Sequence, residues 1–512
     1  MIEPRLGAGR DGGSAFIGRR YHFVGVGGIG MSSLARLLLS WGAAVSGSDR
    51  SESEMLAILR TEGADVCVGH NAGAITSRPQ PDFVVYSKAI PTDNPELSMA
   101  RNLGIPTMHR AELLNHMMAD HRSVCICGTH GKTTTTAMLA VILIDAGMDP
   151  SVMLGGMYAP IGGNERSGHG EVFVAEACEA YGSFLSLHPD LAVVTNIEAD
   201  HLDENTTFDS IRESFHSFLS RVPDDGLIAA CIDSVEVCRL LPRLIAPVRT
   251  FGLEGSGAEW QAQRSNDGSW DVQIHGRAVA HLALQVPGVH NVVNALGALA
   301  IAEALGVSPW DAAESLHLFE GVERRFSIRG VSGGILVVDD YAHHPSEIRV
   351  TLRAARALLP EWTTVSFSDV GANPGRRTSP VNQGCGGGTQ SSTPRLDRRL
   401  IAVFQPHLFS RTAAFMDEFV ESFEDADIVL ITEIYAAREN PIAGINGCAL
   451  ADRLRNRWPG KGVQMVQHLR SLPERVAAIS RPGDIVLALG AGNITNSVPE
   501  ILQLLKTGSV HT

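Results

Sequence analysis

A strand that runs directly into a glycine-bounded loop and then a helix is the feature that most restricts the fold of this chain. The stretch is CICGTHGKTTTTAMLA, residues 125–140, and its first three residues are the end of the apolar strand SVCIC at 123–127. In a parallel sheet, such a turn points backbone N–H groups and the positive end of a helix at one place, where phosphate binds. Gly128 and Gly131 permit the tight path, while Lys132 can reach terminal phosphates and Thr133 can offer its hydroxyl to Mg²⁺.

This loop is shorter than the common nucleotide-binding loop, which has a glycine where this chain has Ile126. Lysine is scarce in the chain, because only Lys88, Lys132, Lys461 and Lys506 occur and arginine is used nearly everywhere else. A lysine at this point of the loop therefore indicates a functional role. Because a loop lysine buries little area, we expect Lys132→Ala to abolish ADP release with little loss of stability.

Apolar strands alternate with helical segments along the whole chain, as in YHFVGV at 21–26, EVFVAE at 171–176 and RRLIAVF at 398–404. This alternation is typical of mostly parallel sheets covered by helices on both faces. We therefore predict the α/β class with three domains. They are a Rossmann-like domain at 1–120, a P-loop ATPase-like domain at 121–325 and a Rossmann-like domain at 326–512.

Composition narrows the classes of function. The chain has 512 residues and a formal charge of −14, which argues against nucleic acid or an anionic membrane surface as the main partner. Its eight cysteines are scattered, and no apolar run approaches the roughly 18–20 residues of a membrane helix. We expect a cytoplasmic protein without membrane insertion. The Gly-, Ser- and Pro-rich segment at 369–397 is interpreted as a disordered insertion without chemistry.

Polar side chains follow two apolar strands after the phosphate loop. Glu176 ends EVFVAE, and Glu198, Asp200 and His201 follow the strand in DLAVVTNIEADH. Because the carboxyl ends of parallel strands meet at one edge of the sheet, these groups are expected to serve a metal ion or a phosphate.

A second glycine-rich turn lies near the start, where GVGGIG supplies Gly25, Gly27, Gly28 and Gly30. With Asp49 at the end of the next strand, the pattern also fits a dinucleotide-binding fold. An NAD-dependent dehydrogenase is therefore an alternative. It is weakened because a second phosphate loop follows where the rest of a dehydrogenase would be.

Six segments in order extend these observations to nearly the whole chain: GTHGKTTTTAML, TNIEADHLD, GVHNVVNALGALA, GVERRF, DDYAHHPSEI and FQPHLFSRT. Together they resemble the Mur ligase family of cell-wall synthesis, in which the short GTxGKT loop is normal. The resemblance implies an ADP-forming ligase that makes a carbon–nitrogen bond during synthesis of peptidoglycan precursors. In the branch that the motifs resemble in detail, ATP activates the lactyl carboxylate of UDP-N-acetylmuramate as an acyl phosphate, and L-alanine attacks it.

The resemblance also implies roles for particular residues. The catalytic residues it implies are Lys132, His201, Arg411 and His344, and those of the Mg²⁺ site are Thr133, Glu176 and His201. The residues implied to bind ATP are Gly128, Thr129, His130, Gly131, Lys132, Thr133, Thr134, His290, Asn291, Asn294, Arg324, Arg325 and Asp339. Those implied to bind the other substrates are Gly25, Gly27, Gly28, Gly30, Asp49, Tyr341, His343 and His407. Which of Arg324 and Arg325 reaches the phosphate is left open.

Two further alternatives stay open, namely a murein-recycling ligase that attaches a preformed peptide to the same sugar nucleotide and a non-catalytic NTP-binding protein. The chain also departs from the family pattern. Cys178 and Asn493 stand where an acid is more usual, and Leu408 stands where some members have an arginine. No lysine lies between Lys132 and Lys461, so the carbamylated lysine of several family members is absent. We expect a monomer or a weak homodimer.

Overall fold

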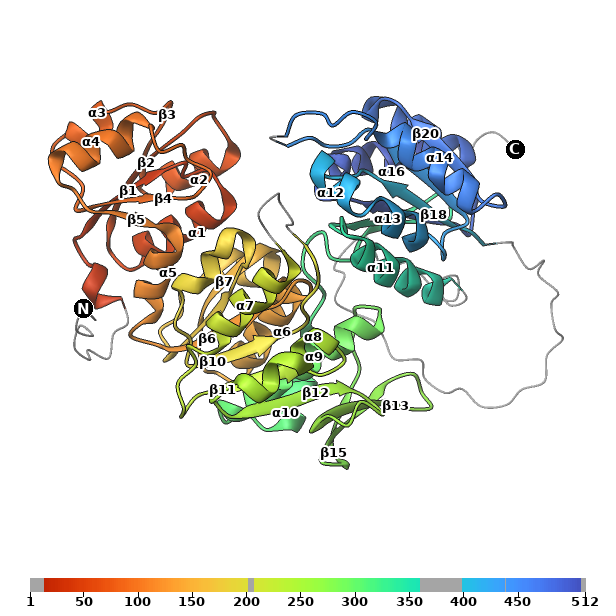
Figure 1. The fold of residues 1–512 in the computed structure, drawn as a ribbon, viewed down its shortest axis with the longest axis horizontal. Helices are drawn as coiled ribbons and strands as arrows, with labels where there is room; N and C mark the ends of the chain where they lie inside the picture. The colour runs from red at the N-terminus through yellow and green to blue at the C-terminus, as the bar shows by residue number, and fades with distance from the viewer. Residues whose placement is uncertain (1–12, 201–206, 360–397, 438, 508–512) are drawn as a thin grey trace. The chain divides into compact units, whose positions relative to one another are not determined.

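The computed structural model describes residues 13–200, 207–359, 398–437 and 439–507, which form two compact units. The first unit comprises residues 13–199, 207–284 and 291–322, and the second contains the remaining described residues. The predicted α/β class with three mostly parallel sheets is confirmed, with two sheets in the first unit and one in the second (Figure 1). The predicted insertion at 369–397 lies outside the described residues. The exact domain limits stay predictions.

The first sheet has five parallel strands in the order β3-β2-β1-β4-β5 (Figure 1). Its strands are β1 (Arg20–Val24), β2 (Ala44–Asp49), β3 (Asp65–Val68), β4 (Phe83–Tyr86) and β5 (Thr107–His109). Its helices are α1 (Ile29–Ser40), α2 (Glu54–Thr61), α3 (Gly73–Thr76), α4 (Pro95–Leu103) and α5 (Arg110–Met118). Strand order reverses at β1, so the glycine-rich turn after β1 lies at the point where such sheets bind ligands.

Alternation of side chains along the strands explains why helices cover both faces of this sheet. Phe23 of β1 belongs to a core that includes Leu34 of α1, whereas the next residue, Val24, packs with Leu97 of α4. Successive strand residues point to opposite faces, so the near-continuous apolar strands each serve two helical layers.

The second sheet has ten strands in the order β15-β14-β13-β12-β11-β10-β6-β9-β7-β8. Its strands are β6 (Arg122–Cys127), β7 (Ser151–Tyr158), β8 (Gly163–Arg166), β9 (Val172–Glu176), β10 (Leu191–Val194), β11 (Leu227–Cys231), β12 (Val248–Leu253), β13 (Trp260–Arg264), β14 (Trp270–Ile274) and β15 (Arg277–Leu282). Its helices are α6 (Lys132–Asp145), α7 (Phe208–Leu219), α8 (Val235–Leu240), α9 (Val289–Ala304) and α10 (Pro309–Ser315). Strand β6 pairs in parallel with β9 and β10, so three carboxyl ends meet beside the phosphate loop.

The first two sheets share one apolar core. Trp41, directly after α1, packs edge-on against Phe173 of β9 and stacks on His121, with ring centroids 6.3 and 5.8 Å apart respectively. The Trp41 indole N–H also donates to Ser167 Oγ at 3.0 Å, and Arg36 of α1 pairs with Glu165 of β8. These contacts join the two sheets into one unit.

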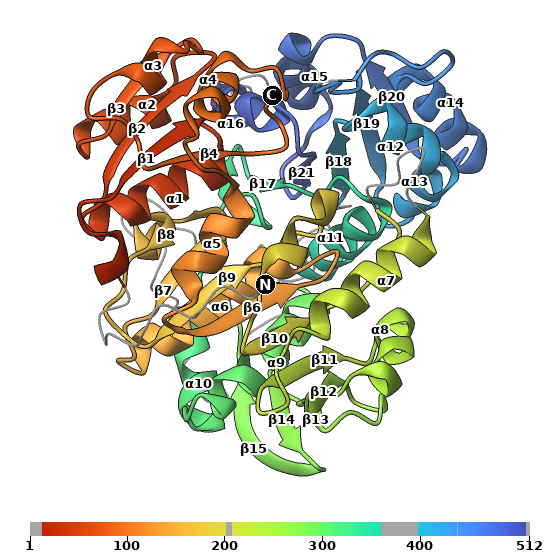
Figure 2. The same cartoon turned by 60° about the vertical axis from the view of Figure 1, so that its left-hand side comes forward.

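The third sheet has six strands in the order β16-β17-β21-β18-β19-β20, and Figure 2 shows β17 to β20 in that order. Its strands are β16 (Ser327–Ser332), β17 (Ile335–Asp340), β18 (Leu400–Phe404), β19 (Ile428–Thr432), β20 (Gly462–Val466) and β21 (Ile485–Leu489). Its helices are α11 (Pro345–Leu358), α12 (Phe409–Ala414), α13 (Met416–Ser422), α14 (Gly447–Arg457), α15 (Leu472–Ile479) and α16 (Val498–Thr507). Val403 of β18 packs with α15 and α16, whereas the next residue, Phe404, contacts Phe419 of α13. Only β16 is antiparallel to its neighbour.

No helix among these described segments has the length and apolar content that crossing a bilayer requires.

Candidate active site

The phosphate loop, residues 128–131, connects β6 to α6 and is fastened to the segment after β10. Gly128 has φ 135° and Gly131 has φ 83°, a region that side chains disfavour, so the turn requires glycine at both points. The N–H of Thr129 donates to Asn196 O, and the N–H of His130 donates to Asn196 Oδ1, both at 2.9 Å. The loop is therefore held in a fixed path at the start of α6.

Lys132 begins α6 and folds its side chain back over the loop. Its ammonium donates to Gly128 O at 2.6 Å, to Thr129 O at 2.9 Å and to Glu179 Oε1 at 3.0 Å. Burial by itself lowers the pKa of the Lys132 ammonium, but the carboxylates of Glu179 and Glu176 raise it above the ordinary value. Lys132 is thus held fully charged at physiological pH.

Glu176 ends β9 and faces the first turn of α6. The Thr133 hydroxyl donates to Glu176 Oε2 at 2.8 Å, and the N–H of Gly155 donates to the same oxygen at 2.8 Å. The sequence predicted Thr133 and Glu176 as oxygen ligands of one metal ion, and the structure brings these two side chains together.

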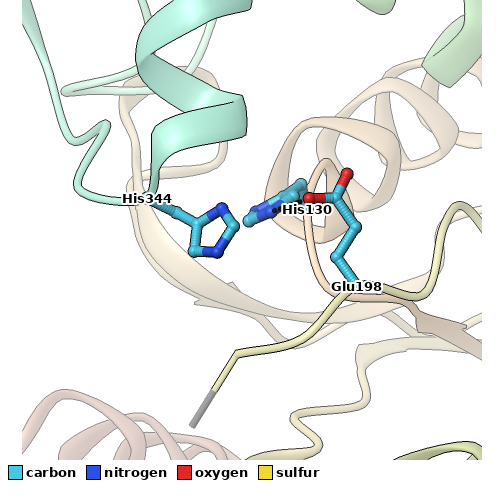
Figure 3. Close-up of side chains that lie close together, drawn as sticks. All are labelled: His130, Glu198 and His344. Carbon is cyan, nitrogen blue, oxygen red and sulfur yellow. Dashed lines mark ion pairs between the residues drawn. The ribbon is translucent and has the colours of Figure 1, made fainter. Parts of the chain in front are cut away.

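His130 and Glu198 lie beside the same loop, and Figure 3 shows both side chains. His130 Nε2 is 3.6 Å from Glu198 Oε2, and the N–H of Glu198 donates to Thr129 Oγ1 at 2.9 Å. The strand-end carboxylate Glu198 is therefore placed at the loop, as its position after an apolar strand indicated. His201, predicted for catalysis and metal binding, lies outside the described residues.

Three of the residues predicted to bind ATP, His290, Asn291 and Asn294, lie on α9. A Cβ atom added to Gly131 would be 2.4 Å from Asn294 Oδ1, so the Asn294 amide lies directly against the phosphate loop. The Asn294 amide also donates to Asn291 Oδ1 at 3.4 Å. His290, at the start of the same helix, belongs to the second unit, where burial and then Arg325 lower its pKa to about 4.

The glycine-rich turn after β1 is organised around Asp49. The N–H of Gly27 donates to Asp49 Oδ2 at 2.9 Å, so this carboxylate supports the turn itself. Gly30 lies in the first turn of α1, and a Cβ atom there would be 3.0 Å from Arg110 Nη1. A guanidinium therefore stands beside the positive end of α1, an arrangement that favours an anion.

His109 adds a third polar group near this turn. No hydrogen-bond partner among the described residues reaches its buried Nε2, while its Nδ1 accepts from the N–H of Ala111 at 3.3 Å. Burial, followed by the charges of Arg110 and Lys88, lowers the pKa of His109. The sequence indicated the glycines of this site but not His109 or Arg110.

In the second unit, Arg324 and Arg325 both cover the ring of Tyr341, at 4.7 and 5.2 Å from its centroid. Arg324 has φ 58°, and its guanidinium donates to Gly490 O at 2.5 Å. Arg325 Nη1 lies 3.5 Å from Glu347 Oε1. The structure thus holds Arg324 on backbone carbonyls and Arg325 on a carboxylate.

The neighbouring aspartates Asp339 and Asp340, which end β17, are buried. Asp339 Oδ2 accepts from the Thr495 hydroxyl at 2.6 Å, and its role in ATP binding stays a prediction. Asp340 accepts from the N–H groups of Phe326 and Ala342 at 2.6 and 2.7 Å, and burial raises its pKa to about 6. Asp340 therefore joins the segment before β16 to the loop that follows β17 and contains Tyr341.

His343, His407 and Arg411, which come from two separate motifs, lie close together in the second unit. The rings of His343 and His407 are 5.9 Å apart, and Arg411 Nη1 lies 3.3 Å from His407 Nδ1. The buried Arg411 also pairs with Asp200 Oδ1 at 2.9 Å. Burial lowers the pKa of His343 to about 3, with Arg411 acting in the same direction against Glu347, so its imidazole is neutral.

His344, predicted to be catalytic, caps the N-terminus of α11 in this structure. Its Nδ1 accepts from the N–H of Ser346 at 3.4 Å, and its ring contacts that of Phe415 at 4.8 Å. A structural role for His344 is therefore visible, and its catalytic role stays a prediction.

The three departures from the family pattern, Cys178, Asn493 and Leu408, lie in described segments. Burial raises the pKa of the Cys178 thiol, so it is neutral where an acid is more usual. Asn493 Oδ1 accepts from Gln405 Nε2 at 2.9 Å. Leu408 has φ 69° directly before α12.

Comparison with known proteins defines the class to which this site belongs. The model "Mur ligase family, catalytic domain" matches residues 20–122, "Mur ligase middle domain" matches 126–302 and "Mur ligase, glutamate ligase domain" matches 389–492. The chain belongs to the Mur ligase family.

The names of individual relatives specify the reaction more closely than the family models do. The UDP-N-acetylmuramate–L-alanine ligase of Trichlorobacter lovleyi is 41% identical over 93% of this chain and 96% of its own length. The ligase of the same name from Caldanaerobacter subterraneus is 39% identical over 93% and 95%, respectively. Among solved structures, UDP-N-acetylmuramate-alanine ligase MurC of Thermotoga maritima has a TM-score of 0.72 at 29% identity, covering 95% of this chain and 99% of its own. The murein peptide ligase of Psychrobacter arcticus has a TM-score of 0.65 at 25% identity, covering 96% and 99%.

Proposed function

We propose that this chain joins L-alanine to the lactyl carboxylate of UDP-N-acetylmuramate while converting ATP to ADP and phosphate, in the synthesis of peptidoglycan precursors. The observation that carries the proposal is the phosphate loop with its charged Lys132, next to the Thr133–Glu176 pair. The names of the relatives that are similar over nearly the whole chain supply the substrates.

The reaction needs activation because a carboxylate is a poor electrophile. The γ-phosphoryl group of ATP first moves to a carboxylate oxygen, which gives an acyl phosphate and ADP. The amine of L-alanine then attacks the carbonyl carbon, and the tetrahedral intermediate expels phosphate to leave the amide. Such chemistry depends on positioning and on neutralising negative charge more than on covalent steps by the protein.

Lys132 and the loop are the groups that we assign to the nucleotide. The backbone N–H groups at the start of α6 and the Lys132 ammonium face the same space, where they can neutralise the terminal phosphates. Asn294, which lies against Gly131, is in place to fix the loop. The roles of His290, Asn291, Arg324, Arg325 and Asp339 in ATP binding are part of the same proposal.

We further propose that Thr133 and Glu176 hold Mg²⁺. Their oxygens already lie together, and Mg²⁺ prefers oxygen ligands, so the donor set fits the ion. When bound, the ion would neutralise charge on the phosphates. The part of this chain is to supply one hydroxyl and one carboxylate from fixed positions on α6 and β9.

The sugar nucleotide is assigned to the first sheet. Its diphosphate would lie at the glycine-rich turn that begins α1, where Arg110 stands beside Gly30 and His109 presents a buried nitrogen. The backbone N–H groups and the positive helix end at this turn could also bind the diphosphate of NAD, but the family to which the chain belongs does not favour a dehydrogenase.

In the second unit we assign the cluster of Tyr341, His343, His407 and Arg411 to the amino-acid and lactyl carboxylates. An arginine suits a carboxylate because its fork of N–H groups donates two parallel hydrogen bonds. Asp200 occupies Arg411 in the present arrangement, so a substrate carboxylate would replace or share that contact.

The decisive experiment measures phosphate release from ATP with UDP-N-acetylmuramate and each of L-alanine, glycine, L-serine and the tripeptide L-Ala-γ-D-Glu-diaminopimelate. We expect the fastest release with L-alanine and none without the sugar nucleotide. Faster release with the tripeptide would instead assign the chain to murein recycling. A melting temperature raised by NAD and not by UDP-N-acetylmuramate would contradict the assignment of the first sheet.

We also propose that the reaction takes place in the cytoplasm, which supplies ATP and keeps thiols reduced, and that the chain is a monomer or weak homodimer. All cysteines of the described segments are free thiols, as expected in that compartment. Size-exclusion chromatography with light scattering at micromolar concentration tests the oligomeric state.

A further inference from the structure

Glu179 lies three residues after Glu176, in the segment that leaves the end of β9. Its carboxylate is 13% exposed and lies 2.9 Å from Lys132 Nζ, whose side chain is 11% exposed. Its Oε1 accepts a hydrogen bond from Lys132 Nζ at 3.0 Å, and its buried Oε2 is the oxygen 2.9 Å from the same nitrogen, with no other donor among the described residues. A nearly buried carboxylate that depends on a single ammonium for its pairing is costly to retain, so its position calls for a functional explanation.

The Lys132 ammonium has no hydrogen left for a ligand in this arrangement. An ammonium group has three N–H donors, and here they serve Gly128 O, Thr129 O and Glu179 Oε1. The two carbonyl oxygens belong to the loop backbone, which Asn196 fastens in place. Glu179 is the side-chain acceptor of the three, so it is the acceptor that can rotate away without remodelling the loop.

A phosphate group that reaches Lys132 must therefore take the position of the Glu179 carboxylate. Both are anions with oxygen acceptors, and both are attracted by the same ammonium and by the start of α6. The two anions also repel each other when both are present, because the site is shielded from water. Glu179 and the terminal phosphate thus compete for one cation.

We propose that Glu179 is a displaceable counter-ion of Lys132, which gives up its place on the ammonium to a nucleotide phosphate and returns when that phosphate leaves. This inference rests on the proposed ATP-dependent function. Glu179 then acts as a positioning residue in two ways. It keeps the buried Lys132 paired between turnovers, and it weakens the binding of the ADP product, which favours release.

The test compares Glu179→Gln with wild type by isothermal titration calorimetry with ADP in EDTA, so that no metal ion contributes. The amide keeps the size of the side chain and removes its charge. We expect ADP to bind about ten-fold more tightly, which corresponds to about 1.4 kcal/mol. A purely structural role would predict weaker binding, and unchanged or weaker binding by a variant that is folded by circular dichroism overturns the proposal.

Glu236→Gln is the matched control. Glu236 of α8 is similarly shielded at 16% exposed and lies in the same unit, where it pairs with Arg212 at 2.8 Å and with Arg239 at 2.5 Å and not with Lys132. Its replacement removes the same charge from the protein and should leave ADP affinity unchanged. A gain of affinity in both variants would mean that net charge alone is responsible, which also overturns the proposal.

Glu179→Asp retains the negative charge. It provides the test if the glutamine variant does not fold. The aspartate is one methylene shorter, so its contact with Lys132 is weaker and ADP should bind between wild type and the expected glutamine value. Equal or weaker binding than wild type would contradict displacement. If wild type itself does not bind ADP, the proposed function and this inference both fail, whereas wild-type binding without a gain in the variants refutes this inference alone.

Discussion

The ion pair between Lys132 and Glu179 makes a quantitative prediction about stability as well as activity. The sequence led us to expect little loss of stability from Lys132→Ala, but the structure places this side chain in a buried pair. Removing one partner of a buried pair leaves the other charge uncompensated, which costs about 3–5 kcal/mol. Because some water can reach Glu179, we take the lower end, about 3 kcal/mol.

The expected result is a melting temperature lower by roughly 6 °C or more, since 1 kcal/mol shifts the melting of a large domain by about 2–4 °C. The double variant Lys132→Ala/Glu179→Gln should recover about 2 kcal/mol of the loss, because no buried charge remains. Neither variant should form ADP, since the ammonium that neutralises the phosphates is gone in both.

Calorimetry or fluorescence-monitored melting of wild type, both single variants and the double variant closes this thermodynamic cycle. Lys132→Met is the control for lost packing, because it keeps the length of the side chain without its charge. The reasoning is refuted if Lys132→Met is as stable as wild type, or if the effects of the two single changes simply add in the double variant.

Three further predictions follow from the structure and the sequence. Gly131→Ala should reduce ADP affinity at least ten-fold, because φ is 83° there and the new Cβ would lie 2.4 Å from Asn294 Oδ1. Gly255→Ala is the control, because its φ is 85° but no atom lies within 4 Å of the new Cβ. It should cost only backbone strain of about 1 kcal/mol and leave the ADP affinity measured by calorimetry unchanged. His290 has a pKa of about 4 in the folded protein and about 6.5 in the unfolded chain, so the unfolded chain binds its proton first as the pH falls, and the protein loses stability between these values. His290→Gln should therefore reduce the fall of melting temperature between pH 7 and pH 5. An unchanged slope of melting temperature against pH would contradict this. Deleting residues 370–396 should leave kcat largely intact, and a large loss in a folded deletion would show that the segment has a function.

Motifs confined to one strand–turn–helix unit could be predicted from the sequence. The phosphate loop and the Thr133–Glu176 pair follow from local patterns, because parallel strands bring their carboxyl ends to one edge. The class of fold followed from the alternation of strands and helices. These features depend on neighbours in sequence or on a rule that every parallel sheet obeys.

Partners that depend on a particular side-chain direction could not be predicted. Glu179 follows a strand just as Glu176 does, but its side chain contacts Lys132 whereas that of Glu176 accepts from Thr133. Arg110 meets Gly30 because β5 leads into α5 beside the glycine-rich turn, a proximity across about 80 residues that no local pattern encodes. The contact of Arg411 with Asp200 joins segments even farther apart along the chain.

The packing of Trp41 against Phe173 limits how this chain can be divided. A fragment that ended near residue 120 would leave the Trp41 ring and the apolar side of α5 facing water, without the strand that covers them. Such a fragment is expected to aggregate when expressed, even though its five-stranded sheet is complete. A cut after Val322 preserves this shared core, so a fragment used for ligand screening on the first sheet should extend to that residue.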